Sequence, residues 1–317
     1  MLDAGEVLQA RDVSTDPRNI YTCIGCTSTL TSFSTSIDKS YFGAATDGDR
    51  DAIVKYIQGV CPASGTCYNP DNWKLGDVFR STPITISTPS TAIEDKRDTS
   101  SYTVDCVRGL NCADTVEDQT VNAYGYFRCT NCRSSALGNR LIVSGANDGQ
   151  FHAFLTSNMT EAWSFIPPNL LSKLKNITHA TDPSALIHQY FVDGPVSASS
   201  AWLGSGDGKT KGNTEWKTVL VFAEGRGSTD RLWSASTSCA TGLQATYDAS
   251  HPNYCGYYVL NVSTASSPQY MWIMNGFDAN TAANFGFAIL SDIEVFLLLQ
   301  AAQGDQRSNV LQAPKVT

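Results

Sequence analysis

Short apolar runs alternate with turn-forming residues through residues 139–167. The runs are residues 141–144, 151–155 and 162–166. Asn147-Asp148-Gly149 stands between the first two, and an Asp-Gly pair tolerates the positive φ that a tight hairpin turn requires. The pattern therefore predicts two antiparallel strands joined by a hairpin, followed by a third strand that carries Trp163 and Phe165.

A similar order of apolar runs and turns returns further along the chain. The corresponding segments are residues 216–223, 225–227, 257–262 and 269–273. Repeated four-stranded antiparallel units are typical of β-propeller blades, which stack around an axis and so hide their edges. The sequence therefore predicts an all-β fold: an incomplete β-propeller of antiparallel four-stranded blades, with long disulfide-bearing insertions and a few short helices.

Three parts follow one another along the chain in this interpretation. Residues 1–74 form a loop-rich lead-in with one helix, residues 75–290 form the partial propeller, and residues 291–317 form a tail of undetermined structure. Blade one spans residues 75–167 with an insertion at 88–139, and blade two spans residues 189–273. Two blades do not close a ring, so this part alone would leave sheet edges exposed.

The helix predicted in the lead-in begins near an aspartate-rich stretch. Asp47 or Asp49 is expected to cap it, and Gly59 marks its end. Asp47, Asp49 and Asp51 also resemble the start of a calcium-binding loop. However, Ala52 stands where such a loop needs Gly, and Gln58 stands where it needs Glu. The three aspartates are therefore weak calcium candidates, and the helix-start interpretation is favoured.

The insertion at residues 88–139 is rich in Ser, Thr and Asp and carries four cysteines. Because the sequence of a loop can vary without disturbing the sheet that carries it, this insertion is a candidate for the main recognition surface. The alternative is a long loop without a function of its own. The polar excursion at residues 236–253 is a second candidate for recognition. Between the two blades, residues 169–177 predict a short amphipathic helix with its leucines on one side.

Ten cysteines fall into five close pairs: Cys23/Cys26, Cys61/Cys67, Cys106/Cys112, Cys129/Cys132 and Cys239/Cys255. An even number at close spacing indicates local disulfides formed in an oxidising compartment. The alternative is a zinc site in which two CxxC knuckles, at Cys23/Cys26 and Cys129/Cys132, supply four thiolates. Disulfides are favoured, because the two knuckles lie far apart in the chain.

Charge and hydropathy narrow the functional classes further. The net charge is −8 and the basic residues are scattered, whereas a nucleic-acid interface needs a concentrated basic patch. No transmembrane span is predicted, since the most apolar run, residues 285–299, contains Asp292 and Glu294. The N-terminus lacks the basic and apolar regions of a signal peptide. An exported protein of this sequence is thus expected to be a fragment whose export signal is missing.

No catalytic constellation is predicted. The chain has four histidines, at positions 152, 179, 188 and 251, and His152 and His188 are placed on strands as structural groups. The glycine-rich loop at residues 204–213 lacks the spacing of a phosphate-binding loop and lies between two strands. Motifs of serine hydrolases and zinc peptidases are missing as well. We therefore expect no enzymatic activity.

Several segments resemble the C-terminal propeller domain of PilY-type proteins. The segments are GANDGQFHAF, WSFIPPNLL and YFVDGP, preceded in the family's order by DAGEVLQAR, IVKYIQG and KLGDVFRSTPI. The resemblance runs from about residue 3 to about residue 275. The signature residues that it marks as structural are Gly145, Asn147, Asp148, Gly149, His152, Asp193 and Gly194.

The resemblance implies an exported, non-catalytic adhesin or assembly factor of type IV pili, or a fragment of one. Its partners would be minor pilins or the pilus tip, together with a host or abiotic surface. It would reach the extracellular pilus tip through the periplasm. Calcium is also implied, although the usual acidic loop is not found in this chain. The alternative is a fragment of a quinoprotein dehydrogenase, whose propeller binds pyrroloquinoline quinone, but no ligand set for that cofactor is recognised.

Overall fold

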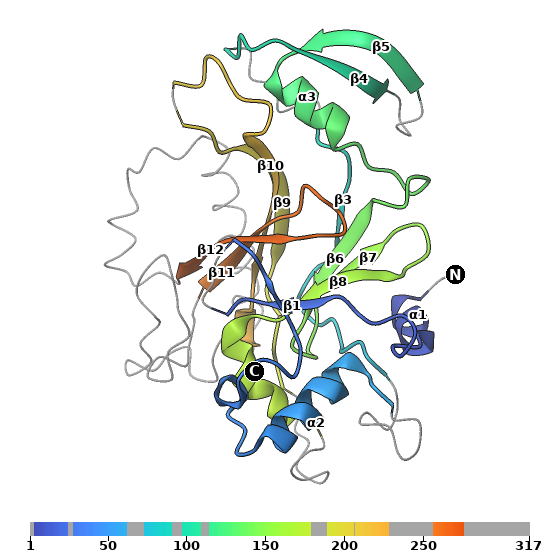
Figure 1. The fold of residues 1–317 in the computed structure, drawn as a ribbon, viewed down its shortest axis with the longest axis vertical. Coiled ribbons are helices and arrows are strands. Elements are labelled where there is room, and N and C mark those ends of the chain that lie inside the picture. The colour runs from blue at the N-terminus through green and yellow to red at the C-terminus, as the bar shows by residue number, and fades with distance from the viewer. Residues whose placement is uncertain are drawn as a thin grey trace, which may run out of the picture.

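The computed structural model describes residues 3–24, 28–61, 73–90, 97–108, 114–178, 189–205, 207–227 and 256–275. Their strands form sheets of six, four and two strands (Figure 1). The predicted hairpin around Asn147 is the centre of the largest sheet. Strands β6 (Leu141–Gly145) and β7 (Phe151–Leu155) pair antiparallel, and β7 pairs in turn with β8 (Glu161–Phe165). The predicted antiparallel strands are confirmed here.

The six-stranded sheet has the order β2-β1-β8-β7-β6-β3. Strand β3 (Ile84–Ile86) pairs antiparallel with β6. At the other edge, β1 (Ile20–Thr22) lies parallel to β8, and β2 (Thr31–Ser32) pairs with β1. The lead-in therefore contributes two strands that the sequence analysis missed. They cover the otherwise unpaired backbone of β8.

The lead-in also contains more helix than predicted. Helix α1 (Ala4–Ala10) was missed, and α2 (Asp47–Gln58) is the helix that was expected. The N-cap of α2 is Thr46 rather than an aspartate, and Asp49 completes a capping box with it, while Gly59 ends the helix at φ 78°. A short 3-10 helix, η1 (Lys39–Phe42), precedes α2.

The second sheet is a four-stranded antiparallel meander. It consists of β9 (Val196–Trp202), β10 (Trp216–Ala223), β11 (Gly256–Asn261) and β12 (Gln269–Asn275). Both faces of this sheet are apolar. Leu220, Phe222 and Tyr258 point into the core shared with the first sheet, whereas Val219 and Val221 belong to a separate cluster on the opposite face. This alternation follows from the two-residue period of strands.

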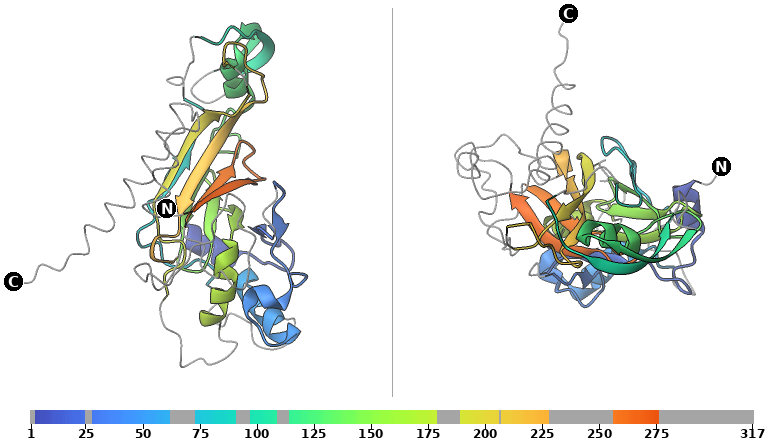
Figure 2. Two further views of the ribbon diagram at one scale, coloured as in Figure 1. Left: turned by 90° about the vertical axis from the view of Figure 1, so that its left-hand side faces the viewer. Right: turned by 90° about the horizontal axis from the view of Figure 1, so that it is seen from above.

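The insertion at residues 88–139 is more ordered than predicted. It contains a two-stranded hairpin, β4 (Tyr102–Arg108) and β5 (Asp114–Val121), followed by α3 (Ala123–Thr130). Figures 1 and 2 show this unit at the far end of β9 and β10. Tyr124 and Phe127 of α3 form a small core with Trp216 of β10. The apolar partner that orders the insertion thus comes from sheet two, which the local sequence could not indicate.

Between the sheets, η3 (Pro168–Asn176) replaces the short helix predicted at residues 169–177. It is a 3-10 helix, and its buried leucines are those placed on one side by the prediction: Leu170, Leu171 and Leu174. A second 3-10 turn, η5 (Gly225–Gly227), follows β10.

The two larger sheets approach each other at β3 and β9, and their facing side chains share one hydrophobic core. The described strands close into neither a barrel nor a ring, so the propeller stays a prediction. Among the helices of the described ranges, none is long and apolar enough to cross a membrane.

Candidate functional site

The turn between β6 and β7 is the point at which distant segments meet. Its residues Asn147, Asp148 and Gly149 are called the signature turn below. The side chain of Asn147 donates to Asp77 Oδ2 at 2.9 Å and accepts from the main-chain N–H of Phe191 at 3.0 Å. Its own N–H donates to the carbonyl of Asp77 at 3.0 Å. One asparagine therefore ties the hairpin to two other parts of the chain.

Asp148 and Gly149 complete the turn. The Asp148 carboxylate accepts hydrogen bonds from the N–H groups of Gly76 at 2.8 Å and Gln150 at 2.9 Å. Gly149 has φ 93°, and a Cβ added there would lie 2.5 Å from Cδ2 of Leu174. Both the backbone conformation and the packing of the turn thus require glycine, which confirms the hairpin predicted from Asp-Gly.

Behind the turn lies a group of charged residues, Arg18, Asp148, His152 and Glu161, here called the ionic network; all but the partly exposed Asp148 are buried. Arg18 forms a bidentate pair with Glu161, with both N–O distances at 2.7 Å. His152 places Nδ1 2.8 Å from Glu161 Oε1 and Nε2 3.0 Å from Asp148 Oδ2. Arg18 also donates to the carbonyl of Ile57 at 2.8 Å. The network therefore fastens the lead-in and the end of α2 to the hairpin.

Pairing keeps these buried groups charged. Burial alone would lower the pKa of His152, but the charge and hydrogen bond of Asp148, together with Glu161, outweigh it and raise the pKa to about 9. Burial would raise the pKa of Glu161, yet Arg18 and His152 hold it far below its usual range. Both ring nitrogens of His152 face carboxylates and the side chain is buried. This arrangement suits a structural ion cluster better than acid–base catalysis.

Residues 191–194, which contain Asp193 and Gly194, run between the ends of β6 and β10. Val192 donates to the carbonyl of Ala146 at 3.2 Å, and Gly194 donates to the carbonyl of Ala223 at 3.1 Å. Gly194 permits this close packing, because a Cβ there would lie 2.5 Å from the carbonyl oxygen of Ala223.

Asp193 adds a third connection to this junction. Its N–H donates to the carbonyl of Glu224 at 3.0 Å, and its carboxylate accepts from the N–H of Arg80 at 3.0 Å. Gly145 faces the same segment, since a Cβ there would collide with the carbonyl oxygen of Val192. Residues 191–194, called the connecting segment below, therefore join the six-stranded sheet to the four-stranded sheet.

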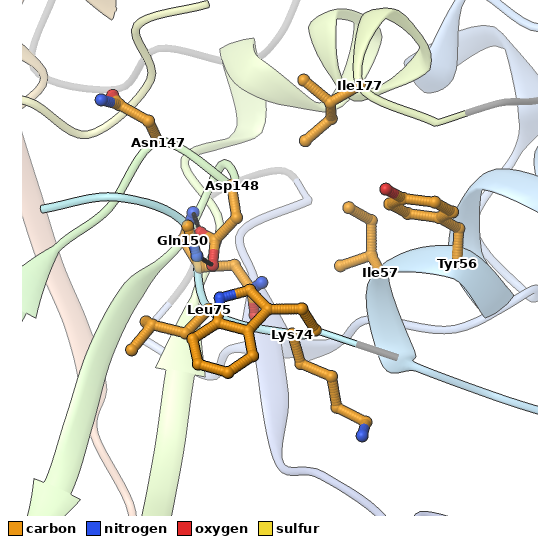
Figure 3. Close-up of a pocket in the computed structure, with 10 residues that line it drawn as sticks. Tyr56, Ile57, Lys74, Leu75, Asn147, Asp148, Gln150 and Ile177 are labelled. Atoms are coloured by element: carbon orange, nitrogen blue, oxygen red, sulfur yellow. Dashed lines mark hydrogen bonds between the residues drawn. The ribbon is translucent and has the colours of Figure 1, made fainter. Parts of the chain in front are cut away.

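A pocket of about 190 Å³ opens beside the signature turn (Figure 3). Its lining residues are Tyr56, Ile57, Trp73, Lys74, Leu75, Gly76, Asn147, Asp148, Gln150 and Ile177. Figure 3 shows the amine of Lys74 pointing away from Asp148, and that amine donates to the carbonyl of Gln9 at 3.0 Å. The polar groups at this pocket are already engaged in the scaffold, and Trp73, 45% exposed, stands at its edge.

The structure brings together the segments on which the family resemblance was based. The signature turn contacts KLGD through Gly76 and Asp77, and YFVDGP through Phe191. Lys74 reaches DAGEVLQAR at Gln9, and Arg18 reaches IVKYIQG at Ile57. Arg18 and Glu161 were missed by the sequence analysis, because no local pattern distinguishes a buried charged pair separated by this much sequence.

The weak calcium candidates serve the start of α2. Asp49 accepts from the N–H of Thr46 at 3.0 Å, and Asp47 and Asp51 form ion pairs with Arg50 at 3.0 and 2.9 Å. Within the described residues, no group of three or more His, Cys, Asp or Glu side chains is arranged to hold a metal. His179, His188 and His251 lie outside the described residues.

The cysteine predictions reach beyond the described residues. Cys26, Cys67, Cys112, Cys239 and Cys255 lie outside them. Of the cysteines that are described, none is a free thiol. The five predicted pairs and the zinc alternative at Cys23, Cys26, Cys129 and Cys132 therefore stay predictions.

Comparison with known proteins shows that the sequence of this chain is similar to PilY1 proteins. The chain is 25% identical over 237 residues to a type IV pilus biogenesis factor PilY1 homolog of Xylella fastidiosa, covering 73% of this chain and 13% of the relative. It is 28% identical over 165 residues to the type IV pilus biogenesis factor PilY1 of Pseudomonas aeruginosa, covering 51% of this chain and 13% of the relative. The chain is similar to PilY-type proteins.

The predicted resemblance to PilY-type proteins is thereby confirmed. A second PilY1 homolog of Xylella fastidiosa is 28% identical over 155 residues, which cover 48% of this chain and 10% of that protein. The chain thus spans about a tenth of the length of the PilY1 relatives that it matches. No family model matches the chain, and no solved structure matches it.

Proposed function

We propose that this chain is a segment of an exported, type IV pilus-associated protein that acts in pilus assembly or surface adhesion without catalysis. The observation that carries the proposal is the similarity to PilY1 proteins over 73% of the chain. The named role of those relatives is type IV pilus biogenesis. Partners of the intact protein would be minor pilins or the pilus tip, and a host or abiotic surface.

We further propose that the two larger sheets are blades of an incomplete β-propeller. Three features support this architecture. Each sheet contains a four-stranded antiparallel meander, β3-β6-β7-β8 in one and β9-β10-β11-β12 in the other. The first strands of the two meanders, β3 and β9, contact each other. Both faces of the second sheet are apolar, as expected of a blade with neighbours on two sides.

In this proposal the signature residues stabilise the fold, and the polar segments at residues 88–139 and 236–253 bind the surface. Asn147, Asp148 and His152 are committed to hydrogen bonds or ion pairs within the chain. The β4–β5 hairpin and α3 instead extend from the end of the second sheet (Figure 2). We therefore assign adhesion to the insertion at residues 88–139 and to residues 236–253, the second of which lies outside the described ranges.

The proposal is tested in the bacterium that carries the gene. Disruption of the gene should reduce the pili recovered by shearing or the attachment of cells to a surface, and the intact gene should restore both. Antibody detection of the protein in the sheared fraction tests its export and its association with pili. Normal pili, normal attachment and a protein confined to the cell interior would together refute the proposal.

A further inference from the structure

Arg133 is a buried cation without a carboxylate partner in the part of the chain that the structure describes. It follows α3, and its side chain is only 3% exposed. One terminal nitrogen, Nη2, donates to the carbonyl oxygens of Val262 and Ser263, the latter at 2.8 Å. The other, Nη1, has no hydrogen-bond partner among the described residues. No ion pair joins it to a described carboxylate, and burial lowers its pKa to about 10.

A second unpartnered donor borders the same two residues. Thr218 of β10 donates its N–H to Ser263 Oγ at 2.9 Å, and its carbonyl accepts from the N–H of Val262 at 2.8 Å. Its side chain is 5% exposed, yet its hydroxyl has no partner within the described part of the chain. Thr218 and Arg133 therefore both contact Val262 and Ser263, and each keeps one buried donor without a partner among the described residues.

Arg133 contrasts with the buried Arg18 of the ionic network. Buried charges in proteins are paired, because an isolated ion loses its hydration without compensation. Arg18 obeys that rule through its bidentate contact with Glu161. Arg133 receives two neutral carbonyls, which satisfy hydrogen bonds but bring no opposite charge. The charge of Arg133 is therefore not compensated by any carboxylate of the described residues.

We propose that Arg133 Nη1 and Thr218 Oγ1 hold one small monovalent inorganic anion, of which chloride is the physiological example. A single charge suffices, because one guanidinium is uncompensated. A larger anion such as phosphate does not suit two donors that are almost completely buried. This site is independent of the proposed pilus function, since it rests on the buried donors alone.

The anion would fix the position of the insertion on the second sheet. The main chain of Arg133 is held by Thr88, whose hydroxyl donates to its carbonyl at 3.0 Å and accepts from its N–H at 2.8 Å. The side chain of Arg133 reaches the other way, to the residues that follow β11. Chloride bound between Arg133 and Thr218 would therefore strengthen the connection between residues 88–139 and β10.

Thermal unfolding of the whole chain in chloride tests the site, with gluconate as the replacement anion at constant ionic strength. The unfolding temperature should rise continuously with the logarithm of the chloride concentration, as mass action requires for a ligand of the native state. Arg133→Gln should abolish this dependence. Arg128→Gln is the matched control, because Arg128 lies in the same segment and donates to the carbonyl of Pro89; it should keep the dependence.

Two further measurements decide the outcome if Arg133→Gln does not fold. Thr218→Val removes the second donor without changing the size of the side chain and should weaken the chloride dependence. Crystals grown in bromide should show an anomalous difference peak within contact distance of Arg133 Nη1. Equal stability in chloride and gluconate, or a water molecule in place of bromide, would overturn the proposal.

Discussion

His152 and Glu161 of the ionic network are buried, as Glu224 is, but the network and Glu224 differ in charge. In the network, each charged group has a partner of opposite sign: Arg18 pairs with Glu161, and His152 lies between Glu161 and Asp148. Glu224 accepts from Asn169 Nδ2 at 2.9 Å, and its second oxygen has no partner among the described residues. Burial raises its pKa to about 8, against the weaker opposing effects of Asn169 and Lys173.

The difference shows that pairing, rather than burial, decides whether an interior group is ionised. The network remains charged near neutral pH, whereas Glu224 remains a neutral acid. A paired charge is stabilising only while its partner is present, because removal of one member leaves the other buried and uncompensated. A neutral carboxylic acid needs no neighbour of opposite charge. Mutations at the two places should therefore differ strongly.

The largest effect is expected when the network loses one member. Arg18→Met should destabilise the protein by about 3–5 kcal/mol, because Glu161 then lacks its bidentate partner. Glu224→Gln keeps an acceptor for Asn169 and should change the free energy of unfolding at pH 5 by less than about 1 kcal/mol. Urea denaturation of both variants measures the contrast. Equal losses would show that pairing does not distinguish the two sites.

The second-largest loss of stability is expected from a substitution in the signature turn, which carries Asp148 of the ionic network. Gly149→Val should lower the free energy of unfolding by more than the roughly 1–2 kcal/mol expected from an unfavourable positive φ. The reason is that the new side chain would also collide with Leu174. Gly138→Val is the matched control: Gly138 has φ 62°, but a Cβ there meets nothing within 4 Å. Chemical denaturation should find the Gly149 variant less stable than the Gly138 variant. Similar values would exclude a packing contribution at the turn.

Alkaline pH should weaken both sites, but over different ranges. Glu224 has its ordinary pKa of 4.5 in the unfolded chain and about 8 in the folded protein, so its contribution is complete below pH 4.5 and is lost as pH rises through 8. For His152 the corresponding values are 6.5 and about 9. Between pH 5 and 6.5, only Glu224 of these two groups should lower stability as pH rises.

Glu224→Gln should therefore flatten the decline between pH 5 and 6.5 and leave only the part due to His152 at higher pH. The expected change in slope corresponds to uptake of about one proton on folding. Denaturation midpoints measured across this range for the native protein and the variant give the slope directly. An unchanged slope in the variant would show that Glu224 is ionised in the folded protein.

The smallest effect on stability is expected at the tip of the insertion. Deletion of the residues between Cys106 and Cys112 should change the free energy of unfolding by less than about 0.5 kcal/mol, because surface segments contribute little to the core. The same deletion should weaken attachment to a surface. Thermal melting beside a binding assay separates the two outcomes. A Gly149→Val variant that folds but does not bind, beside a deletion variant that binds normally, would reverse the assignment of scaffold and recognition site.

The elements predicted correctly are those encoded by neighbouring residues. Strands β6 and β7 follow from two apolar runs around Asp148-Gly149, and β10 follows from its continuous apolar run. Strand β1 was missed because its partner β8 is distant in the chain and parallel to it. Helix α3 was missed because its core partner is Trp216.

The candidate site, too, could be predicted only where neighbouring residues determine its structure. Glycine at position 149 could be predicted, since a local backbone requirement selects it. Asp193-Gly194 carries the same dipeptide, but its role in close packing is set by Ala223 of another strand. Arg18, Glu161 and Arg133 look in the sequence like ordinary surface charges. Their burial is decided by tertiary contacts alone.

The connecting segment has a mechanical consequence. Its residues 191 and 192 are bonded to Asn147 and Ala146 on one side, and residues 193 and 194 are bonded to Glu224 and Ala223 on the other. A tensile load that separates the two sheets must therefore break the bonds on at least one side of this segment. A short stretch of backbone thereby contributes to the force at which the two sheets part.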